Sequence, residues 1–163
     1  MDPLISVSGA GEVFQMEPGS LVRFKVFSKD TAGLIEMYER EVPPRTIGAD
    51  PHLHRTTTEV FYVVEGSPVI QCGDVIRSYG PGSIVVVPKN TVHAYGNPTD
   101  APIKVLISFS PGLGHEEFFR GLSRLKHGPK ETYQRDLDEL RLRFDSISVP
   151  SAAAPGQDTK GNA

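Results

Sequence analysis

The chain has 163 residues and a mass of 17.8 kDa, enough for one ordinary domain with a single hydrophobic core. Hydrophobic residues make up 38% of it and charged residues 23%, with a formal net charge of -3, so the composition favours a globular protein and gives no reason to expect nucleic acid or an anionic membrane as a partner. The N-terminus lacks the regions of a secretory signal, no segment is apolar over a membrane-spanning length, and Cys72 is the only cysteine. We therefore expect a cytoplasmic protein without an internal disulfide.

Short strand-like runs, separated by Gly, Pro, Asn and Asp, extend from about residue 4 to residue 111. In residues 20–28, Val22, Phe24 and Val26 recur with a period of two, which indicates a strand with one buried face. Residues 33–42 also resemble a strand, but both of its sides carry charged residues, so the face toward the core stays open. Further strands are predicted at residues 60–64, 69–72, 75–79, 84–87, 92–95 and 103–109.

This dense succession of strands favours an antiparallel barrel or sandwich, because closing the sheet hides its edges. The run at residues 84–87, Ile-Val-Val-Val, is apolar on both faces. We interpret this as a strand whose outer side is covered by a second subunit.

The pattern changes after Pro111. Phe118, Leu122 and Leu125 recur at spacings of four and three, and residues 133–144 repeat that pattern, so two amphipathic helices are predicted. We expect the barrel to occupy residues 1–111 and the helical extension, residues 112–146, to pack on the barrel or on a partner chain. Residues 147–163 end in a small, polar, unpatterned stretch, which predicts a disordered tail.

A cluster of candidate metal ligands lies in residues 51–66. Side chains two residues apart in an extended segment point to the same face, so His52 and His54 can direct two imidazoles at one point. Glu59 lies at an odd offset from His54, so the residues between them must turn or bulge if its carboxylate is to join. Imidazole and carboxylate suit first-row divalent metals, and His93, on a separate strand-like run, is the candidate for a fourth ligand.

At these positions the sequence resembles the cupin family, small β-barrels whose metal site is built from two motifs. The first motif is matched, with the expected gaps, by His52, His54, Glu59 and Gly66. The second is matched by Gly82, Pro88, His93 and Asn97. The resemblance implies an all-β cupin barrel, a double-stranded β-helix or jelly roll, followed by the two helices. It also implies one metal ion held by His52, His54, Glu59 and His93.

Two positions depart from the motifs. The opening glycine of the first motif falls at Thr46, whereas this chain has Gly48, so we expect the approach to His52 to bend differently. Asn90 replaces the glycine that follows the proline of the second motif. Asparagine tolerates a left-handed turn better than most residues, so this change is expected to be benign.

Residues 58–66, 88–95 and 110–122 are similar to the corresponding parts of single-domain, quercetinase-like bacterial cupins. This closer resemblance implies a metal-dependent dioxygenase, which in that group opens a flavonol ring, and a homodimer. Single-domain cupins also include polyketide cyclases, so a metal-assisted cyclase or isomerase is the alternative enzyme. A barrel that binds a small ligand without catalysis is the third hypothesis.

Three histidines and one glutamate can bind Fe, Ni, Mn, Cu or Zn alike. They would leave coordination positions open for the enolate or phenolate of an aromatic or polyketide-like substrate. Dioxygen would be the co-substrate of the dioxygenase. Glu59 is then expected to act both as ligand and as proton acceptor. Tyr95 shares the face of His93, where its hydroxyl would contact substrate or a ligand imidazole. The remaining histidines, His115 and His127, lie in or beside the predicted helices and are poorer ligand candidates.

Overall fold

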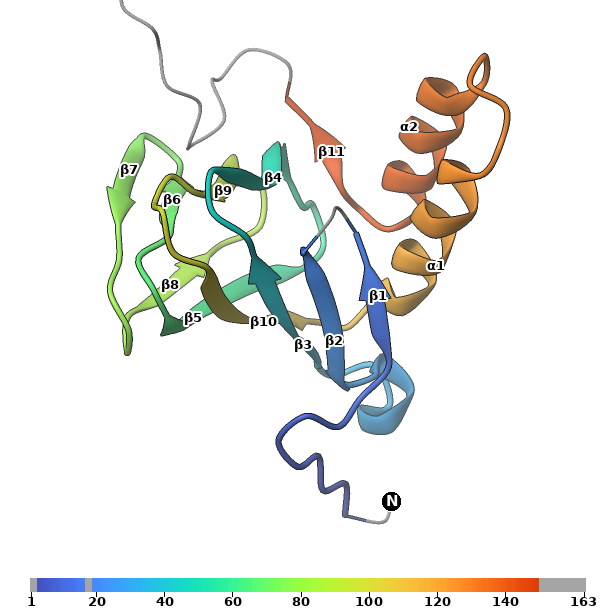
Figure 1. The fold of residues 1–163 in the computed structure, drawn as a ribbon. Helices are drawn as coiled ribbons and strands as arrows, with labels where there is room; N and C mark the ends of the chain where they lie inside the picture. The colour runs from blue at the N-terminus through green and yellow to red at the C-terminus, as the bar shows by residue number, and fades with distance from the viewer. Residues whose placement is uncertain (1–2, 17–18, 150–163) are drawn as a thin grey trace, which may run out of the picture.

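The computed structural model describes residues 3–16 and 19–149 (Figure 1). In chain order its elements are β1 (Val13–Gln15), β2 (Leu21–Val26), the 3-10 helix η1 (Ser28–Thr31), β3 (Glu36–Val42), β4 (Thr46–Leu53), β5 (Thr58–Glu65), β6 (Val69–Cys72), β7 (Val75–Ser78), β8 (Ile84–Val87), β9 (His93–Asn97), β10 (Ile103–Ser110), α1 (His115–Lys126), α2 (Tyr133–Arg143) and β11 (Ile147–Ser148). The eight strands predicted from the sequence are confirmed. The sequence did not predict β1, η1, β11 or most of β4.

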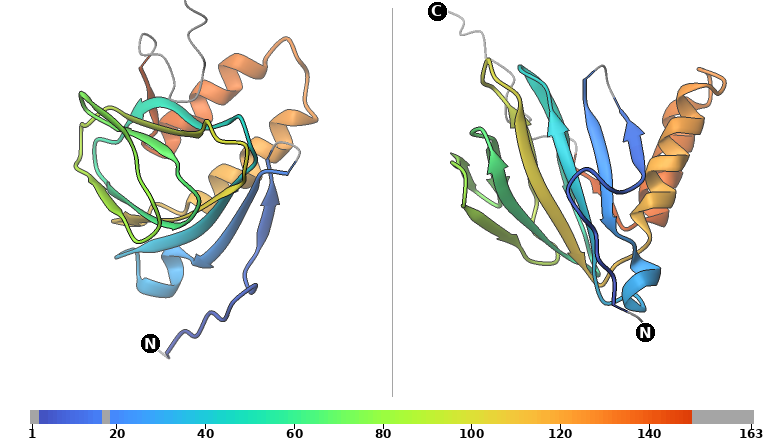
Figure 2. Two further views of the ribbon diagram at one scale, coloured as in Figure 1. Left: turned by 60° about the vertical axis from the view of Figure 1, so that its left-hand side comes forward. Right: turned by 60° about the horizontal axis from the view of Figure 1, so that its bottom comes forward.

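The strands form two antiparallel sheets that close around one interior. The first sheet has the order β1-β2-β3-β10-β5-β8, and the second has the order β11-β4-β9-β6-β7. The left view of Figure 2 shows the strands curving around this interior, with the helices outside it. The predicted fold, a jelly-roll barrel followed by two helices, is confirmed.

Apolar side chains from the inner faces of both sheets fill the barrel. Phe24, Phe61 and Ile107 come from the first sheet and are completely buried. Ile70, from β6 of the second sheet, is equally buried in the same cluster. Burial of this apolar surface is the main term that stabilises the closed barrel.

Strand β3 resolves the face that the sequence left open. Its buried side chains alternate along the strand and are Glu36, Tyr38, Arg40 and Val42. Charged side chains are rarely so buried unless they have a partner, because the cost of removing a charge from water must be offset. The two charged residues of this inward face therefore call for a specific explanation, which the site provides.

Helices α1 and α2 pack against each other on one flank of the barrel, with β1 and β11 next to them (Figures 1 and 2). Phe119 of α1 enters the barrel core, where its ring centroid lies 5.3 Å from that of Tyr38 and 5.8 Å from that of Phe24. The predicted apolar stripe, which begins at Phe118, is only half-buried. The deepest contact therefore lies one position further along the helix, at Phe119.

The end of the described chain differs from the prediction of a tail that starts at residue 147. Ile147 and Ser148 pair with Leu53 and His52 as strand β11, because the free edge of β4 offers unpaired backbone hydrogen-bonding groups. The rest of the predicted tail, residues 150–163, lies outside the described residues.

The outer side of β8 is uncovered in the single chain. Ile84 is 62% exposed and Val86 55%, and Tyr62 of the neighbouring strand, which pairs with Ile84, is 41% exposed. The second subunit predicted to cover this strand stays a prediction.

No helix in the described ranges is long and apolar enough to cross a membrane.

Candidate metal centre

The four predicted ligands meet at one point of the barrel interior. His52 is the next-to-last residue of β4, His54 follows that strand, Glu59 is the second residue of β5 and His93 begins β9. One ligand atom from each lies within 4.8 Å of the others. His52 and His93 are register partners in one sheet, whereas Glu59 belongs to the other, so the site joins the two sheets.

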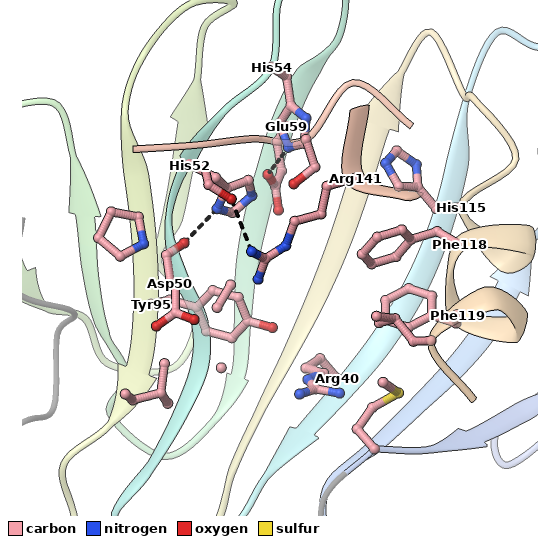
Figure 3. A pocket seen from close by; sticks show the side chains of 18 of the residues that line it. Arg40, Asp50, His52, His54, Glu59, Tyr95, His115, Phe118, Phe119 and Arg141 are labelled. Carbon is pink, nitrogen blue, oxygen red and sulfur yellow. Dashed lines mark hydrogen bonds and ion pairs between the residues drawn. The ribbon is translucent and has the colours of Figure 1, made fainter. Parts of the chain in front are cut away.

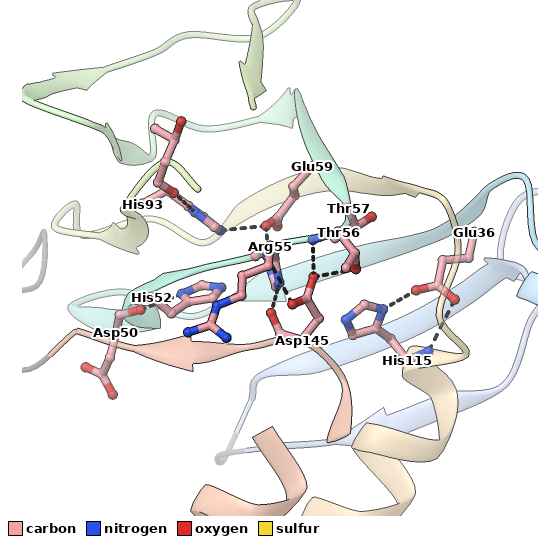
Figure 4. Close-up of polar contacts among 12 residues, drawn as sticks. Glu36, Asp50, His52, Arg55, Thr56, Thr57, Glu59, His93, His115 and Asp145 are labelled. Carbon is pink, nitrogen blue, oxygen red and sulfur yellow. Dashed lines mark hydrogen bonds and ion pairs between the residues drawn. The ribbon is translucent and has the colours of Figure 1, made fainter. Parts of the chain in front are cut away.

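The residues between His54 and Glu59 form the turn that the spacing required. Strand β4 ends at Leu53 and β5 begins at Thr58, which reverses the chain and brings Glu59 toward the histidines. Thr57 anchors the turn by donating its hydroxyl hydrogen to the carbonyl of Pro111 at 2.7 Å. Asp145, far along the chain, holds the same turn through its carboxylate (Figure 4).

The three imidazoles are oriented in the same way. Each donates its Nδ1 hydrogen to a backbone carbonyl: His52 to Asp50 at 2.7 Å, His54 to Asp145 at 2.7 Å and His93 to Thr91 at 2.9 Å. A hydrogen bond of this kind fixes the ring and leaves the lone pair of the neutral ring on Nε2. The Nε2 atoms of His54 and His93 face Glu59, so the donor set fits a divalent first-row metal ion.

Glu59 is the electrostatic centre of the cluster. Its Oε2 lies 2.7 Å from His93 Nε2 and 3.2 Å from His54 Nε2. Burial by itself would raise the pKa of Glu59, but the charge that His93 carries when protonated and the close contacts with the His54 and His93 side chains outweigh burial and lower that pKa. The carboxylate is therefore ionised at neutral pH, as a metal ligand must be.

The charge of Glu59 favours the protonated form of both His93 and His52, but the net pKa shifts of these two histidines have opposite directions. Burial lowers the pKa of His93, yet attraction to Glu59 is stronger and the net pKa is raised. Burial, reinforced by the nearby charge of His93, lowers the pKa of His52 to about 3. His52 thus stays neutral and ready to bind a cation throughout the physiological range.

A cavity of about 340 Å³ opens beside the cluster (Figure 3). His52, His54 and Glu59 line one part of it, and the rings of Phe109, Phe118 and Phe119 line another. This volume lies within the range of small-molecule sites, and its mixture of apolar walls and a few convergent polar groups is typical of them.

Tyr95 lines this cavity on the same face of β9 as His93. It is 4% exposed, and its ring lies so close to Gly48 that a Cβ at Gly48 would come within 2.1 Å of a ring carbon. Burial raises the pKa of the Tyr95 hydroxyl, against the opposing effect of Arg40, so the group is protonated at neutral pH. Gly48, the displaced glycine of the first motif, thus makes room for Tyr95 at an irregular stretch of the β4–β9 pairing.

The second departure from the motifs is also explained. Asn90 has φ of 62°, the left-handed conformation for which asparagine was expected to substitute for glycine. Asn97, the last residue of the second motif, has a structural role. Its completely buried amide donates to the carbonyls of Val42, Pro43 and Ala101.

His115 and Arg40, which line the cavity, and Glu36, which holds His115, were not predicted as site residues. His115, considered a poor ligand candidate, is 4% exposed and donates its Nδ1 hydrogen to Glu36. Glu36 also accepts from the backbone N–H groups of Gly114 at 2.8 Å and His115 at 3.2 Å. Arg40 is 6% exposed and lines the same cavity. The one signal in the sequence was the alternation of residues 33–42, which places Glu36 and Arg40 on the side of Tyr38 and Val42.

Comparison with known proteins agrees with this fold and site. A model of the cupin domain matches residues 38–109, which contain all four ligand positions. Residues 38–109 therefore form a cupin domain. This cupin is 31% identical over 145 residues to quercetin 2,3-dioxygenase of Bacillus subtilis, a match that covers 89% of the chain and 41% of that enzyme.

Solved cupin structures share the fold at lower identity. KdgF from a Halomonas species has a TM-score of 0.59 at 19% identity, covering 68% of this cupin and 94% of that chain. An RmlC-like cupin from Shewanella frigidimarina has a TM-score of 0.54 at 17% identity, and the match covers 68% of this chain and 93% of that chain. The chain spans less than half the length of the Bacillus enzyme, so the activity of this cupin is argued from its own site.

Proposed function

We propose that this cupin is a metal-dependent enzyme, a dioxygenase that acts on an aromatic or enolisable small molecule. The observation that carries the proposal is the convergence of His52, His54, Glu59 and His93 beside a cavity with aromatic walls. The 31% identity with quercetin 2,3-dioxygenase supports the reaction type.

A divalent ion bound by these residues would supply a positive centre that favours the enolate or phenolate form of the substrate. Glu59 is ionised and lines the cavity, so its carboxylate can accept the hydroxyl proton of the substrate. The protonated Tyr95 hydroxyl can donate a hydrogen bond to a substrate oxygen. Glu59 and Tyr95 are therefore the residues to which we assign proton acceptance and substrate positioning.

The walls of the cavity select the shape of the substrate. Phe109, Phe118 and Phe119 form an apolar surface on the side of α1 and β10. Aromatic side chains of this kind bind flat rings by offset or edge contacts and keep water away from the reacting atoms. A ring that rests on them can present its oxygen substituent to the four ligands.

A metal-assisted cyclase or isomerase is the second candidate. It is favoured by the proton-transfer groups around the cavity, since burial raises the pKa of both Tyr38 and Tyr95 and keeps them protonated. Acid–base groups with a cation suffice for cyclisation or isomerisation without oxygen. A binding module without catalysis is the third candidate.

Metal analysis followed by oxygen-electrode measurements tests these alternatives. The wild type, His93→Ala and the control His127→Ala, which changes an exposed histidine, are purified without added metal. The expected result is near-stoichiometric Fe, Ni, Mn, Cu or Zn in the wild type and the control, and loss of that metal in His93→Ala. Uptake of oxygen with a flavonol or with enolisable aromatic acids, absent in His93→Ala, would support the dioxygenase.

Bound metal without oxygen uptake on any of these compounds, combined with product formation under nitrogen, would move the assignment to the cyclase or isomerase. Absence of metal under every loading condition would overturn the metal-dependent enzyme and favour the binding module. Unchanged metal content in His93→Ala would show that the four residues are not the ligand set.

A further inference from the structure

Arg40 places a buried positive charge in the wall of the cavity. It belongs to the inward face of β3, is 6% exposed and contributes to the cavity lining. Its Nε and Nη1 atoms are buried and have no hydrogen-bond partner. Figure 3 shows the guanidinium beside the cavity, with Tyr95 on one side and Phe119 on the other. An arginine stays charged at any physiological pH, so this position holds a cation whose hydrogen-bonding capacity is partly unused.

The carboxylates near the cavity are engaged elsewhere. Glu36 accepts hydrogen bonds from His115 and from two backbone N–H groups, and Glu59 faces His54 and His93. Asp50 also lines the cavity but is exposed at its rim. Within the described ranges, Arg40 therefore has no carboxylate that neutralises it.

Further positive charge and an unused ring nitrogen face the same space. Arg141, from α2, lines the cavity with its guanidinium next to Ser148, to which it donates at 3.0 Å. His115 Nε2 is buried without a hydrogen-bond partner, while its Nδ1 is held by Glu36 (Figures 3 and 4). A divalent ion held by three imidazoles and one carboxylate would add one more net positive charge. Arg40, Arg141 and such an ion thus favour a ligand that brings negative charge and hydrogen-bond acceptors.

We propose that the cavity binds an anion, an aromatic or enolisable carboxylic acid whose carboxylate pairs with Arg40 while its enol or phenol oxygen faces the four-ligand cluster. Carboxylate matches a planar guanidinium in shape and charge, and the aromatic wall fits the ring of such an acid. The identification of this acid as the substrate rests on the proposed function, which it narrows. A flavonol without a carboxylate would leave Arg40 unpaired.

Binding to the zinc-loaded protein tests the proposal apart from the oxygen chemistry. Calorimetric titrations compare three carboxylates, benzoate, cinnamate and 3-phenylpropanoate, with their uncharged amides. The variants are Arg40→Met and the control Arg77→Met, which changes an exposed arginine on β7. We expect the wild type and the control to bind at least one carboxylate about tenfold more tightly than its amide, in line with the strength of a buried charge-assisted hydrogen bond. In Arg40→Met this preference should vanish, with the affinity for the amide and the metal content unchanged.

The thermal stability of Arg40→Met provides a second test of the proposal. Removal of an unneutralised buried charge is expected to raise the Tm of the ligand-free protein. Equal binding of acids and amides by the wild type, no binding of any acid, or a preference that survives in Arg40→Met would overturn the proposal. A preference for acids that depends on Arg40, in a protein that consumes no oxygen, would retain the anion site and overturn only the dioxygenase.

Discussion

Asp145 connects the C-terminal segment to the turn that carries His54, and we predict that metal affinity depends on it. Its carboxylate accepts hydrogen bonds from the N–H of Arg55 at 3.0 Å, and from the N–H and the hydroxyl of Thr56, both at 2.7 Å. Its backbone carbonyl accepts the Nδ1 hydrogen of His54. Asp145→Gly removes the three side-chain bonds and keeps the carbonyl. Glycine also tolerates the φ of 58° at this position.

The magnitude follows from those three bonds. Each contributes about 1 kcal/mol net at an exposed position, so their sum is at most about 3 kcal/mol. Part of this free energy holds His54 in place, and loss of a group that supports a metal ligand weakens binding by about 10- to 100-fold. Such a change corresponds to about 1.4 to 2.7 kcal/mol, which fits within the sum.

Competition with a chromogenic zinc chelator at neutral pH measures the effect. Asp145→Asn keeps one oxygen acceptor and the left-handed turn, so a smaller loss is expected. Asp138→Asn, a change of the exposed acid on α2 that accepts a bond from Gln134, serves as the control and should bind zinc as the wild type does. If Asp145→Gly binds zinc within a factor of two of the wild type, while circular dichroism shows a folded chain, the carboxylate does not position His54 and the reasoning fails.

Three further predictions concern the stability, the pH dependence and the assembly of the protein. Glu36→Gln should destabilise the fold at pH 7 by about 3 kcal/mol in urea unfolding, because the buried carboxylate accepts hydrogen bonds from His115 and from two backbone N–H groups, and the amide turns one acceptor oxygen into a donor. Burial raises the pKa of Glu36, but His115 and two backbone N–H groups lower it overall, so this contribution is complete above pH 4.5 and is lost as the pH falls through the lowered folded-state pKa. A difference between wild type and variant that does not shrink on acidification would contradict this assignment. Metal affinity should fall as the pH drops through the raised pKa of His93, because the metal ion competes with a proton for this imidazole. Below that pKa the affinity should fall by about tenfold per pH unit. Zinc affinities that stay constant from pH 8.5 to 5.5 would contradict this competition. Ile84→Lys should convert a homodimer into a monomer in light scattering, because Ile84 is exposed on the outer face of β8, and a dimer that persists would locate the interface elsewhere.

The sequence predicted the ligand set because every part of that signal is local. The two-residue spacing of His52 and His54, the gap to Glu59 and the setting of His93 are all readable along the chain, and the structure brings these side chains within 4.8 Å. The alternation in β2 likewise predicted the inner face of that strand, since a strand buries every second residue.

Other features of the site could not be predicted from short stretches of sequence. Alternation shows that Glu36 and Arg40 share a face of β3, but not which face is inside, because both faces carry charges. His115 belongs to the site because Glu36, 79 residues earlier in the chain, is placed against it. Asp145 supports the turn after His54 over a separation of about 90 residues. Such contacts depend on which segments the closed barrel brings together.

The sequence by itself therefore determined the barrel, the two helices and the four candidate ligands of one metal, since periodicity and short spacings encode them. Tertiary structure alone decided the positive wall formed by Arg40, the pairing of Glu36 with His115 and the anchoring of the C-terminal segment on β4. The physical reason is that burial, charge compensation and hydrogen-bond partners are properties of a place in the fold, and that place is made by segments that are distant in the chain.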